Sequence, residues 1–223
     1  MGRWMTGRFR DPVNGLLHGA ALLLSIVGTA VLVWSCKADP ARAMTAFVYG
    51  LSMCGCFLAS SLHHLLRGSR KTEMRLLKLD HAAIYPFIAG SYTPVCVHLI
   101  PGASGILLLG VVWAIALVGV VYKLVFAREP ESVDDPPELG STLLYVAMGW
   151  LIVWKLSEVL AHSHGLSIVL AMAGGIAYTL GGIILTRRLF DWWPGRWGHH
   201  ENWHVFVMVG AACFYAFLYI NLV

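Results

Sequence analysis

The sequence predicts an all-α protein, a bundle of seven transmembrane helices with its N-terminus in the cytoplasm and its C-terminus outside. Hydrophobic residues make up 58% of the 223 positions, only 13% are charged, and the mean hydropathy is +0.69. Soluble domains, by contrast, are about a quarter charged. Seven apolar runs joined by short connections leave room for a single membrane domain over residues 1–223. The net charge of +4 is therefore interpreted as membrane topology and not as a nucleic-acid-binding surface.

Each apolar run is long enough to cross the hydrocarbon core of a bilayer, which is about 30 Å thick. The runs cover residues 16–35, 43–66, 79–99, 104–126, 141–161, 166–185 and 203–223. Backbone polar groups must be paired within lipid, so each run should be helical. The first run is too long for the apolar part of a signal peptide and is predicted to be a true span. Several runs are separated by helix breakers or polar segments: Asp39-Pro40, Pro101-Gly102, the acidic linker 129–138 and the turn 162–165.

The predicted orientation follows from the distribution of basic residues between the two sides of the membrane. Seven spans place the N-terminal tail and the second, fourth and sixth loops on one side. That side carries twelve basic residues: Arg3, Arg8, Arg10, Arg67, Arg70, Lys71, Arg75, Lys78, Arg128, Arg187, Arg188 and Arg196. The loops of the opposite side carry only Lys37 and Arg42. Because basic loops stay in the cytoplasm, this asymmetry predicts a cytoplasmic N-terminus and a multi-pass protein of the cell membrane.

Three polar clusters, distant in the chain, fall at the cytoplasmic ends of their predicted spans. His200 and His204 are four residues apart at the start of the last run, so a helix presents both imidazoles on one face. Ser60 and His64 have the same spacing at the end of the second run, and Asp80 lies at the start of the third. The predicted topology therefore brings all three clusters to a similar depth on one side of the membrane.

These residue types predict a metal site. His64, His200 and His204 are the expected ligands, and three histidines leave the fourth position of tetrahedral zinc open for water, as in catalytic sites. Zinc would lower the pKa of that water towards about 7 and polarise a carbonyl. Asp80 would hold or deprotonate the water, or else fix the tautomer of an imidazole. Ser60 would donate a hydrogen bond to the water or to an oxyanion. Imidazole also suits copper, iron and nickel, so the spacing alone does not select zinc.

The remaining histidines are weaker candidates for ligands. His18 lies on the cytoplasmic side and could approach the site. Three histidines neighbour the candidates but point about 100° away on a helix, which favours supporting or surface roles. These are His63, His81 and His199. Three others fall near the outer ends of spans and are predicted to lie outside the site. These are His98, His162 and His164.

Two further features of the spans have structural interpretations. Lys155 and Glu158 are three residues apart in the fifth run, so they can pair on one helix face. A charged residue within a membrane span suggests a functional role by default. The alternative that we favour here is a neutralised pair that faces the interior of the bundle. In the sixth run, Gly174-Gly175 and Gly181-Gly182 suit close packing between helices.

At these same residues the chain resembles the hemolysin III family, the bacterial branch of the progestin and adipoQ receptor group. Segment 59–64, ASSLHH, is similar to the family's Ser-x-x-x-His motif. Segment 78–94, KLDHAAIYPFIAGSYTP, is similar to its aspartate motif, and segment 200–207, HENWHVFV, to its last motif. The resemblance covers nearly the whole chain and implies a seven-helix fold with its N-terminus inside. It also implies site residues, namely zinc on His64, His200 and His204 with Asp80 and Ser60 around a metal-bound water.

One position departs from the family pattern. His63 stands where bacterial members usually have an aromatic residue, which leaves His63 open as an alternative ligand to His64. The four-residue spacing from Ser60 favours His64. Members of the wider group include alkaline ceramidases, so the resemblance implies a hydrolase that acts on an amide or ester of a membrane lipid.

Three classes of function remain open from the sequence. The first is a zinc-dependent membrane hydrolase, with membrane lipids as partners and possible substrates. The second is a non-enzymatic sensor or membrane-homeostasis protein with structural zinc, and the third is a channel, transporter or cytolysin. An enzyme needs an open metal position and an apolar cavity that reaches it, whereas a sensor could keep the histidines without such access. A pore needs a continuous polar path, and away from the cytoplasmic clusters the spans offer little beyond Lys155 and Glu158.

Overall fold

The computed structural model describes residues 9–127, 138–193 and 197–223. Its helices, in chain order, are α1 (Pro12–Ser35), α2 (Pro40–Leu65), α3 (Arg70–His98), α4 (Ala103–Val121), the π-helical turn η1 (Tyr122–Phe126), α5 (Leu139–Trp150), the 3-10 turn η2 (Leu151–Lys155), α6 (Leu156–His162), α7 (Gly165–Arg187) and α8 (His199–Leu222). The predicted acidic linker 129–138 lies outside the described residues except for Glu138, and so do Arg3, Arg8, Arg128 and Arg196.

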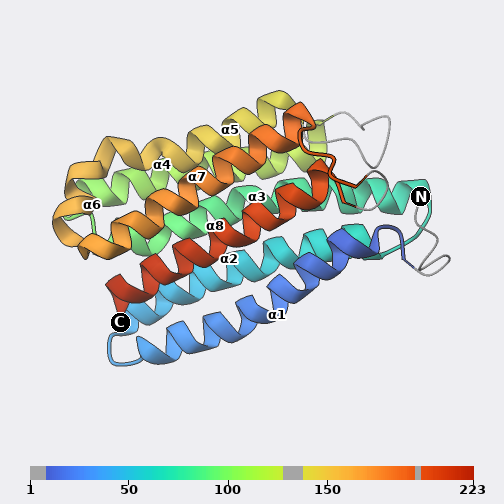
Figure 1. Ribbon diagram of the computed structural model, residues 1–223. Coiled ribbons are helices and arrows are strands. Elements are labelled where there is room, and N and C mark those ends of the chain that lie inside the picture. The colour runs from blue at the N-terminus through green and yellow to red at the C-terminus, as the bar shows by residue number, and fades with distance from the viewer. Residues whose placement is uncertain (1–8, 128–137, 194–196) are drawn as a thin grey trace.

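The helices form seven rods side by side, because η1 extends α4 and η2 joins α5 to α6 (Figure 1). Within the described ranges, six of these rods are long and apolar enough to cross a membrane, and α3 is the seventh. Helix α1 begins at one end of the bundle and α8 finishes at the other, as an odd number of spans requires (Figure 1). The predicted seven-helix bundle is confirmed, whereas the cytoplasmic placement of the N-terminus stays a prediction.

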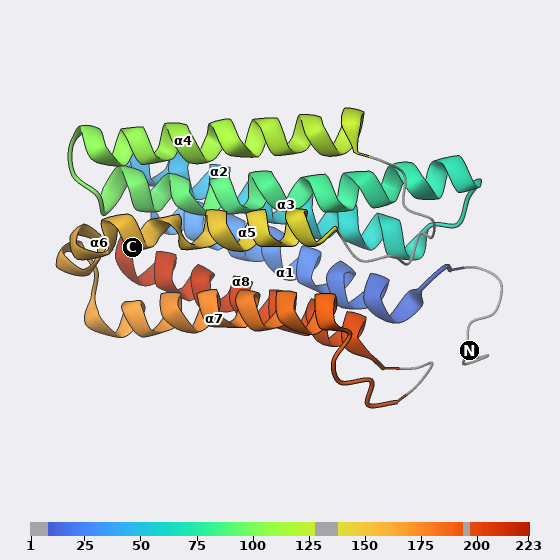
Figure 2. The same cartoon turned by 90° about the horizontal axis from the view of Figure 1, so that it is seen from above.

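Helix α3 lies inside the bundle, where it contacts α2, α4 with η1, α5 and α8. Figure 2 shows it between α4 and α7, which lie at opposite edges of the view. Pro86 and Pro94 lie within the helix, and its charged first half makes it less apolar than the other rods. It begins well before the predicted start at residue 79, because Ser69 accepts a capping hydrogen bond from the Thr72 N–H (3.3 Å). The charged first turns of α3 therefore continue the helix beyond its apolar part.

The fifth rod is not the uniform helix that the sequence predicted over 141–161. It tightens into a 3-10 turn over Leu151–Lys155. The buried Tyr92 hydroxyl of α3 donates to the carbonyl oxygens of Met148 (2.7 Å) and Gly149 (2.9 Å) and accepts from the Ile152 N–H (2.9 Å). One side chain thus pairs the backbone groups that the break releases, as an apolar surrounding requires.

Glycines bring α7 and α8 into close contact. A Cβ added at Gly181 would lie 2.9 Å from the Phe206 Cβ and from a ring carbon of Trp203. One added at Gly174 would lie 3.2 Å from the Gly210 carbonyl oxygen. The close packing predicted for this part of the chain is confirmed at these two positions, and it holds the first turns of α8 against α7.

Candidate metal centre

Three imidazoles meet at the end of the bundle where α1 begins, α2 ends and α8 begins, which we call the histidine end. His64 comes from the last turn of α2, and His200 and His204 come from the first turns of α8. The ring centroid of His64 lies 5.1 Å from that of His200 and 4.8 Å from that of His204, and the two α8 rings stack at 4.9 Å. Each ring offers one nitrogen within 4.8 Å of the other two. The structure therefore brings the predicted ligand set together.

Hydrogen bonds leave one nitrogen free on two of these rings. His64 Nδ1 lies 3.0 Å from Asp11 Oδ2. Arg10 Nη2 also lies 3.5 Å from the same nitrogen, at the limit of a hydrogen bond. The shorter contact is to a carboxylate, which only accepts, so it assigns the proton to Nδ1 and leaves the lone pair on Nε2. His204 Nδ1 lies 2.6 Å from Nε2 of His18. The Nε2 atoms of His64 and His204 are both buried, and neither has a hydrogen-bond partner among the described residues. A metal ion would satisfy both nitrogens, which are otherwise costly to bury unpaired.

Asp80 of α3 also reaches His64. Asp80, His63 and His64 form a second group whose potential ligand atoms lie within 4.8 Å of one another. Ser60, one helical turn before His64, lines the same small cavity as Asp80. The predicted Asp80 and Ser60 are therefore placed beside the predicted ligands. A surface role for His63 is wrong, because this residue is only 2% exposed.

The contacts of His63 distinguish it from His64. The Arg10 Nη2 lies 2.9 Å from His63 Nε2, and Arg10 Nε donates to the His63 carbonyl oxygen (3.1 Å). A guanidinium only donates, so it occupies the lone pair of His63 Nε2, and its charge opposes a second cation there. His64, which belongs to both groups and has a free Nε2, is the better metal ligand.

Sequence reasoning missed the contribution that the start of α1 makes to the site. The Asp11 N–H donates to the His64 carbonyl oxygen (2.8 Å), and Asp11 Oδ2 also accepts from the Asn14 side chain (2.8 Å). Asn14 Nδ2 in turn donates to Glu201 Oε1 of α8 (3.1 Å). Burial acts to raise the pKa of the Asp11 carboxyl, but hydrogen bonds from His64 and Asn14 outweigh it and lower the pKa to about 2. Asp11 is therefore ionised at neutral pH.

The first turn of α8 is fixed by its own capping contacts. The Gly198 N–H donates to Glu201 Oε2 (2.8 Å), and the Asn202 side chain donates to the Phe190 carbonyl oxygen (2.8 Å). Asp191 Oδ1 lies 2.9 Å from the backbone nitrogen of His199 and 3.0 Å from its ring Nδ1. The hydrogen bond from His199 lowers the pKa of Asp191. These contacts turn His199 away from the three-ring cluster and hold His200 in place.

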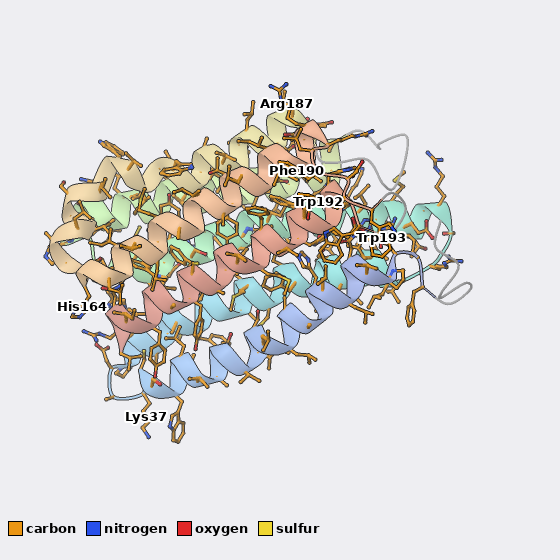
Figure 3. The ribbon with its side chains drawn as sticks, viewed as in Figure 1. Lys37, His164, Arg187, Phe190, Trp192 and Trp193 are labelled. Atoms are coloured by element: carbon orange, nitrogen blue, oxygen red, sulfur yellow. The ribbon has the colours of Figure 1, made fainter. Side chains whose placement is uncertain are left out.

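The other histidines lie largely where the sequence placed them. His18 does reach the site, with its ring centroid 3.8 Å from that of His204. His81 lines the small cavity described below and is not a surface residue. The three predicted to lie outside the site come from helix ends opposite to the histidine end: His98, His162 and His164. Figure 3 shows His164 and Lys37 at the end of the bundle opposite to Trp193. The predicted pair of Lys155 and Glu158 is also confirmed, at 2.9 Å.

Two adjoining cavities extend from the cluster into the bundle. The smaller one, about 40 Å³, has both apolar and polar lining residues, and the polar ones include Ser60, Asp80 and His204. The larger one, about 210 Å³, is almost wholly apolar and lies between α3, α5, α6, α7 and α8. The two share four lining residues: Cys56, Ile84, Trp203 and Val207. An apolar chain in the larger cavity would therefore end beside the histidines.

This donor set suits a divalent transition metal ion. Three imidazoles can be the protein ligands of such an ion, with a carboxylate and a hydroxyl close by. The free Nε2 atoms of His64 and His204 are the observation that supports this fit. The His and Asp clusters of this structure could therefore hold a metal ion.

The fold and the site define a multi-pass integral membrane protein with a buried histidine cluster at one end of its helix bundle. The sequence profile of the family described as "Haemolysin-III related" matches residues 7–215. The chain therefore belongs to this family, as the resemblance at its three motifs implied. It is a multi-pass protein of the cell membrane.

Individual relatives agree with this assignment. The chain is 35% identical over 204 residues to "Hemolysin-3" of Bacillus cereus, which covers 91% of this chain and 87% of that protein. It is 35% identical over 207 residues to "Hemolysin-3 homolog" of Bacillus subtilis (strain 168), which covers 92% and 91%. A more distant similarity, 25% over 222 residues, joins it to human "Monocyte to macrophage differentiation factor", covering 96% and 85%.

Proposed function

We propose that this protein is a zinc-dependent membrane hydrolase that cleaves an amide or ester bond of a membrane lipid. The observation that carries the proposal is the contact between two different cavities. One holds His204, Asp80 and Ser60, and the other is an apolar space large enough for a hydrocarbon chain. A sensor with structural zinc would need the histidines but not the apolar cavity beside them.

His64, His200 and His204 would hold the metal ion, and zinc is the metal that best suits three histidines with an open fourth position. When bound, it would supply Lewis-acid polarisation of a carbonyl and would acidify water. The ligand residues come from two helices that are fixed by α7 and by the start of α1, so the site needs little reorganisation to bind the ion.

The other residues of the site have separate tasks. The apolar cavity binds the acyl chain and places the scissile carbonyl beside Trp203 and Val207, at the junction with the polar cavity. Asp80 accepts the proton of the attacking water and returns it to the leaving amine or alcohol. Ser60, which lines the same cavity as Asp80, donates a hydrogen bond to the oxyanion as it forms.

The first experiment measures metal content in protein purified in detergent without chelators. Elemental analysis would compare the wild type with the His200→Ala/His204→Ala double variant and with a His162→Ala/His164→Ala control from the opposite end. We expect close to one zinc per chain in the wild type and the control, and none in the His200→Ala/His204→Ala protein. The metal-loaded wild type would then be assayed for release of fatty acid from lipid amides and esters.

The result can contradict the proposal at two points. Absence of stoichiometric metal from the wild type would refute the zinc site. Stoichiometric zinc without hydrolysis of any lipid amide or ester would refute the enzyme and favour a sensor with structural zinc.

A further inference from the structure

Two helices of this chain start with the same Asp-Pro pair, but the two aspartates make different contacts. Asp39, before Pro40, is an ordinary N-cap whose Oδ1 accepts from the N–H groups of Ala41 (2.9 Å) and Arg42 (3.2 Å). Asp11, before Pro12, makes no side-chain capping hydrogen bond. Its carboxylate accepts from His64 Nδ1 and from Asn14 instead. The Asp11 side chain is therefore directed at a metal-ligand candidate and not at its own helix.

A glycine allows this contact by letting α1 approach α2 closely. A Cβ at Gly15 would lie 2.5 Å from the Cγ and Cδ2 of Leu65 and 3.3 Å from the Cβ of His64. The Ser61 hydroxyl donates to the Gly15 carbonyl oxygen (3.1 Å). Together with the backbone hydrogen bond from Asp11 to His64, these contacts fix the start of α1 against the last turn of α2.

The next turns of α1 make an equivalent contact with α8. His18 is 4% exposed and lies within hydrogen-bonding distance of His204 Nδ1. Asn14 connects Asp11 to Glu201, one residue after His200. Both imidazoles with a free Nε2 therefore have their Nδ1 atoms engaged by side chains of the same helix.

We infer that the first turns of α1 position the metal ligands, with Asp11 fixing the tautomer and orientation of His64 and His18 fixing the orientation of His204. This inference rests on the proposed function, because it requires that metal binds to His64 and His204. A hydrogen-bond partner on the far nitrogen of a ligating histidine orients the ring, and its loss typically weakens metal binding about 10- to 100-fold. Asp11 and His18 are positioning residues and do not belong to the proposed ligand set.

The test measures zinc affinity by competition with a chelator of known affinity. Asp11→Asn keeps the size of the side chain but removes the carboxylate, and we expect it to weaken zinc binding about 10- to 100-fold. Asp39→Asn is the matched control, because it changes the other Asp-Pro start, and we expect wild-type affinity from it. Gly15→Ala, which forces α1 away from His64, should also weaken binding. Gly55→Ala of α2 is its control, because a Cβ there meets nothing within 4 Å.

A second readout is independent of metal binding and of whether the Asp11 and Gly15 variants fold. Nitrogen NMR of metal-free wild type, labelled at histidine and assigned with a His64→Gln sample, should show His64 with its proton on Nδ1. A proton on Nε2 would overturn the inference. The inference would also be overturned if Asp11→Asn kept wild-type zinc affinity while His64→Ala lost zinc binding. In that case the proposed function would stand. If His64→Ala itself kept full affinity, the proposed function would fail first.

Discussion

The imidazole planes of His64 and His204 cross at 83° with their centroids 4.8 Å apart, although the two residues belong to the second and last helices of the chain. This pairing aligns His64 with the α8 histidines, while Arg10 Nη2 lies closer to the ring of the preceding residue, His63, than to that of His64 (2.9 Å against 3.5 Å). The two neighbouring histidines therefore have different environments and can be separated by experiment.

We expect His64→Ala to abolish stoichiometric metal binding and His63→Ala to keep it, because only His64 belongs to the cluster with both α8 histidines. Elemental analysis of the purified variants gives the answer directly. Metal that disappears with His63 and persists without His200 would instead locate the ion in the group of His63, His64 and Asp80.

The Asp80→Asn substitution should leave zinc binding unchanged and lower the rate of hydrolysis. The amide keeps the shape of the side chain and leaves the three imidazoles in place, so we expect near-wild-type zinc content. It cannot accept a proton, and loss of a general base typically lowers the rate about 10²- to 10⁴-fold. The measurement is the rate of fatty-acid release by metal-loaded enzyme. An unchanged rate in Asp80→Asn would remove Asp80 from the mechanism.

The apolar cavity should determine which acyl chains are accepted. Ala171 of α7 lines this cavity, and Ala171→Phe would fill part of its volume of about 210 Å³. We expect the variant to lose hydrolysis of long-chain substrates more than of short-chain ones, with unchanged metal content. Ala173→Phe is the control, because Ala173 is exposed on the outside of the same helix. Equal effects from the two substitutions would argue against acyl binding in this cavity.

Tyr92→Phe should destabilise the protein through the break in the fifth rod. Loss of the hydroxyl leaves the N–H of Ile152 and the carbonyls of Met148 and Gly149 without this partner. A buried polar group without a partner costs about 1–3 kcal/mol. We expect a lower thermal unfolding temperature in detergent, whereas Tyr219→Phe, at an exposed tyrosine of α8, should leave it unchanged. An unfolding temperature equal to that of the wild type would show that the break is supported in another way.

The orientation of the bundle can be tested with two reporters fused in turn to the C-terminus. The basic-residue asymmetry predicts that the histidine end lies in the cytoplasm and that Val223 lies outside. A C-terminal fusion to alkaline phosphatase, which is active only outside the cytoplasm, should therefore be active. An inactive phosphatase, combined with fluorescence from a cytoplasm-restricted reporter at the same position, would invert the topology.

Hydrophobic run length and residue spacing predicted the seven rods and the cluster of His64, His200 and His204. Both signals are local. Because successive spans cross the membrane in opposite directions, the position of a residue within its span predicts its depth, and no knowledge of side-chain packing is needed. Ser60 and Asp80 were found in the same way, because both lie at the ends of runs on the same side of the membrane.

The sequence could not show which partner a polar group would choose. Asp11-Pro12 and Asp39-Pro40 look alike as helix starts, and only the close approach allowed by Gly15 turns one carboxylate towards His64. The break at Leu151–Lys155 contains no proline that would have predicted it, and its backbone groups are paired by the Tyr92 hydroxyl of a different helix. The sequence left both a supporting and a surface role open for His63, because a helical-wheel argument places a side chain relative to its own axis and ignores Arg10, which packs beside it.

The position of the ligands in the chain also has a consequence for biosynthesis. His64 is inserted early with the second helix, while His200 and His204 enter the membrane only with the last. A ribosome-bound or truncated chain that lacks the final helix has one of the three imidazoles and cannot assemble the cluster. The cluster therefore exists only in chains whose insertion is complete, and occupancy by metal would distinguish finished molecules from unfinished ones.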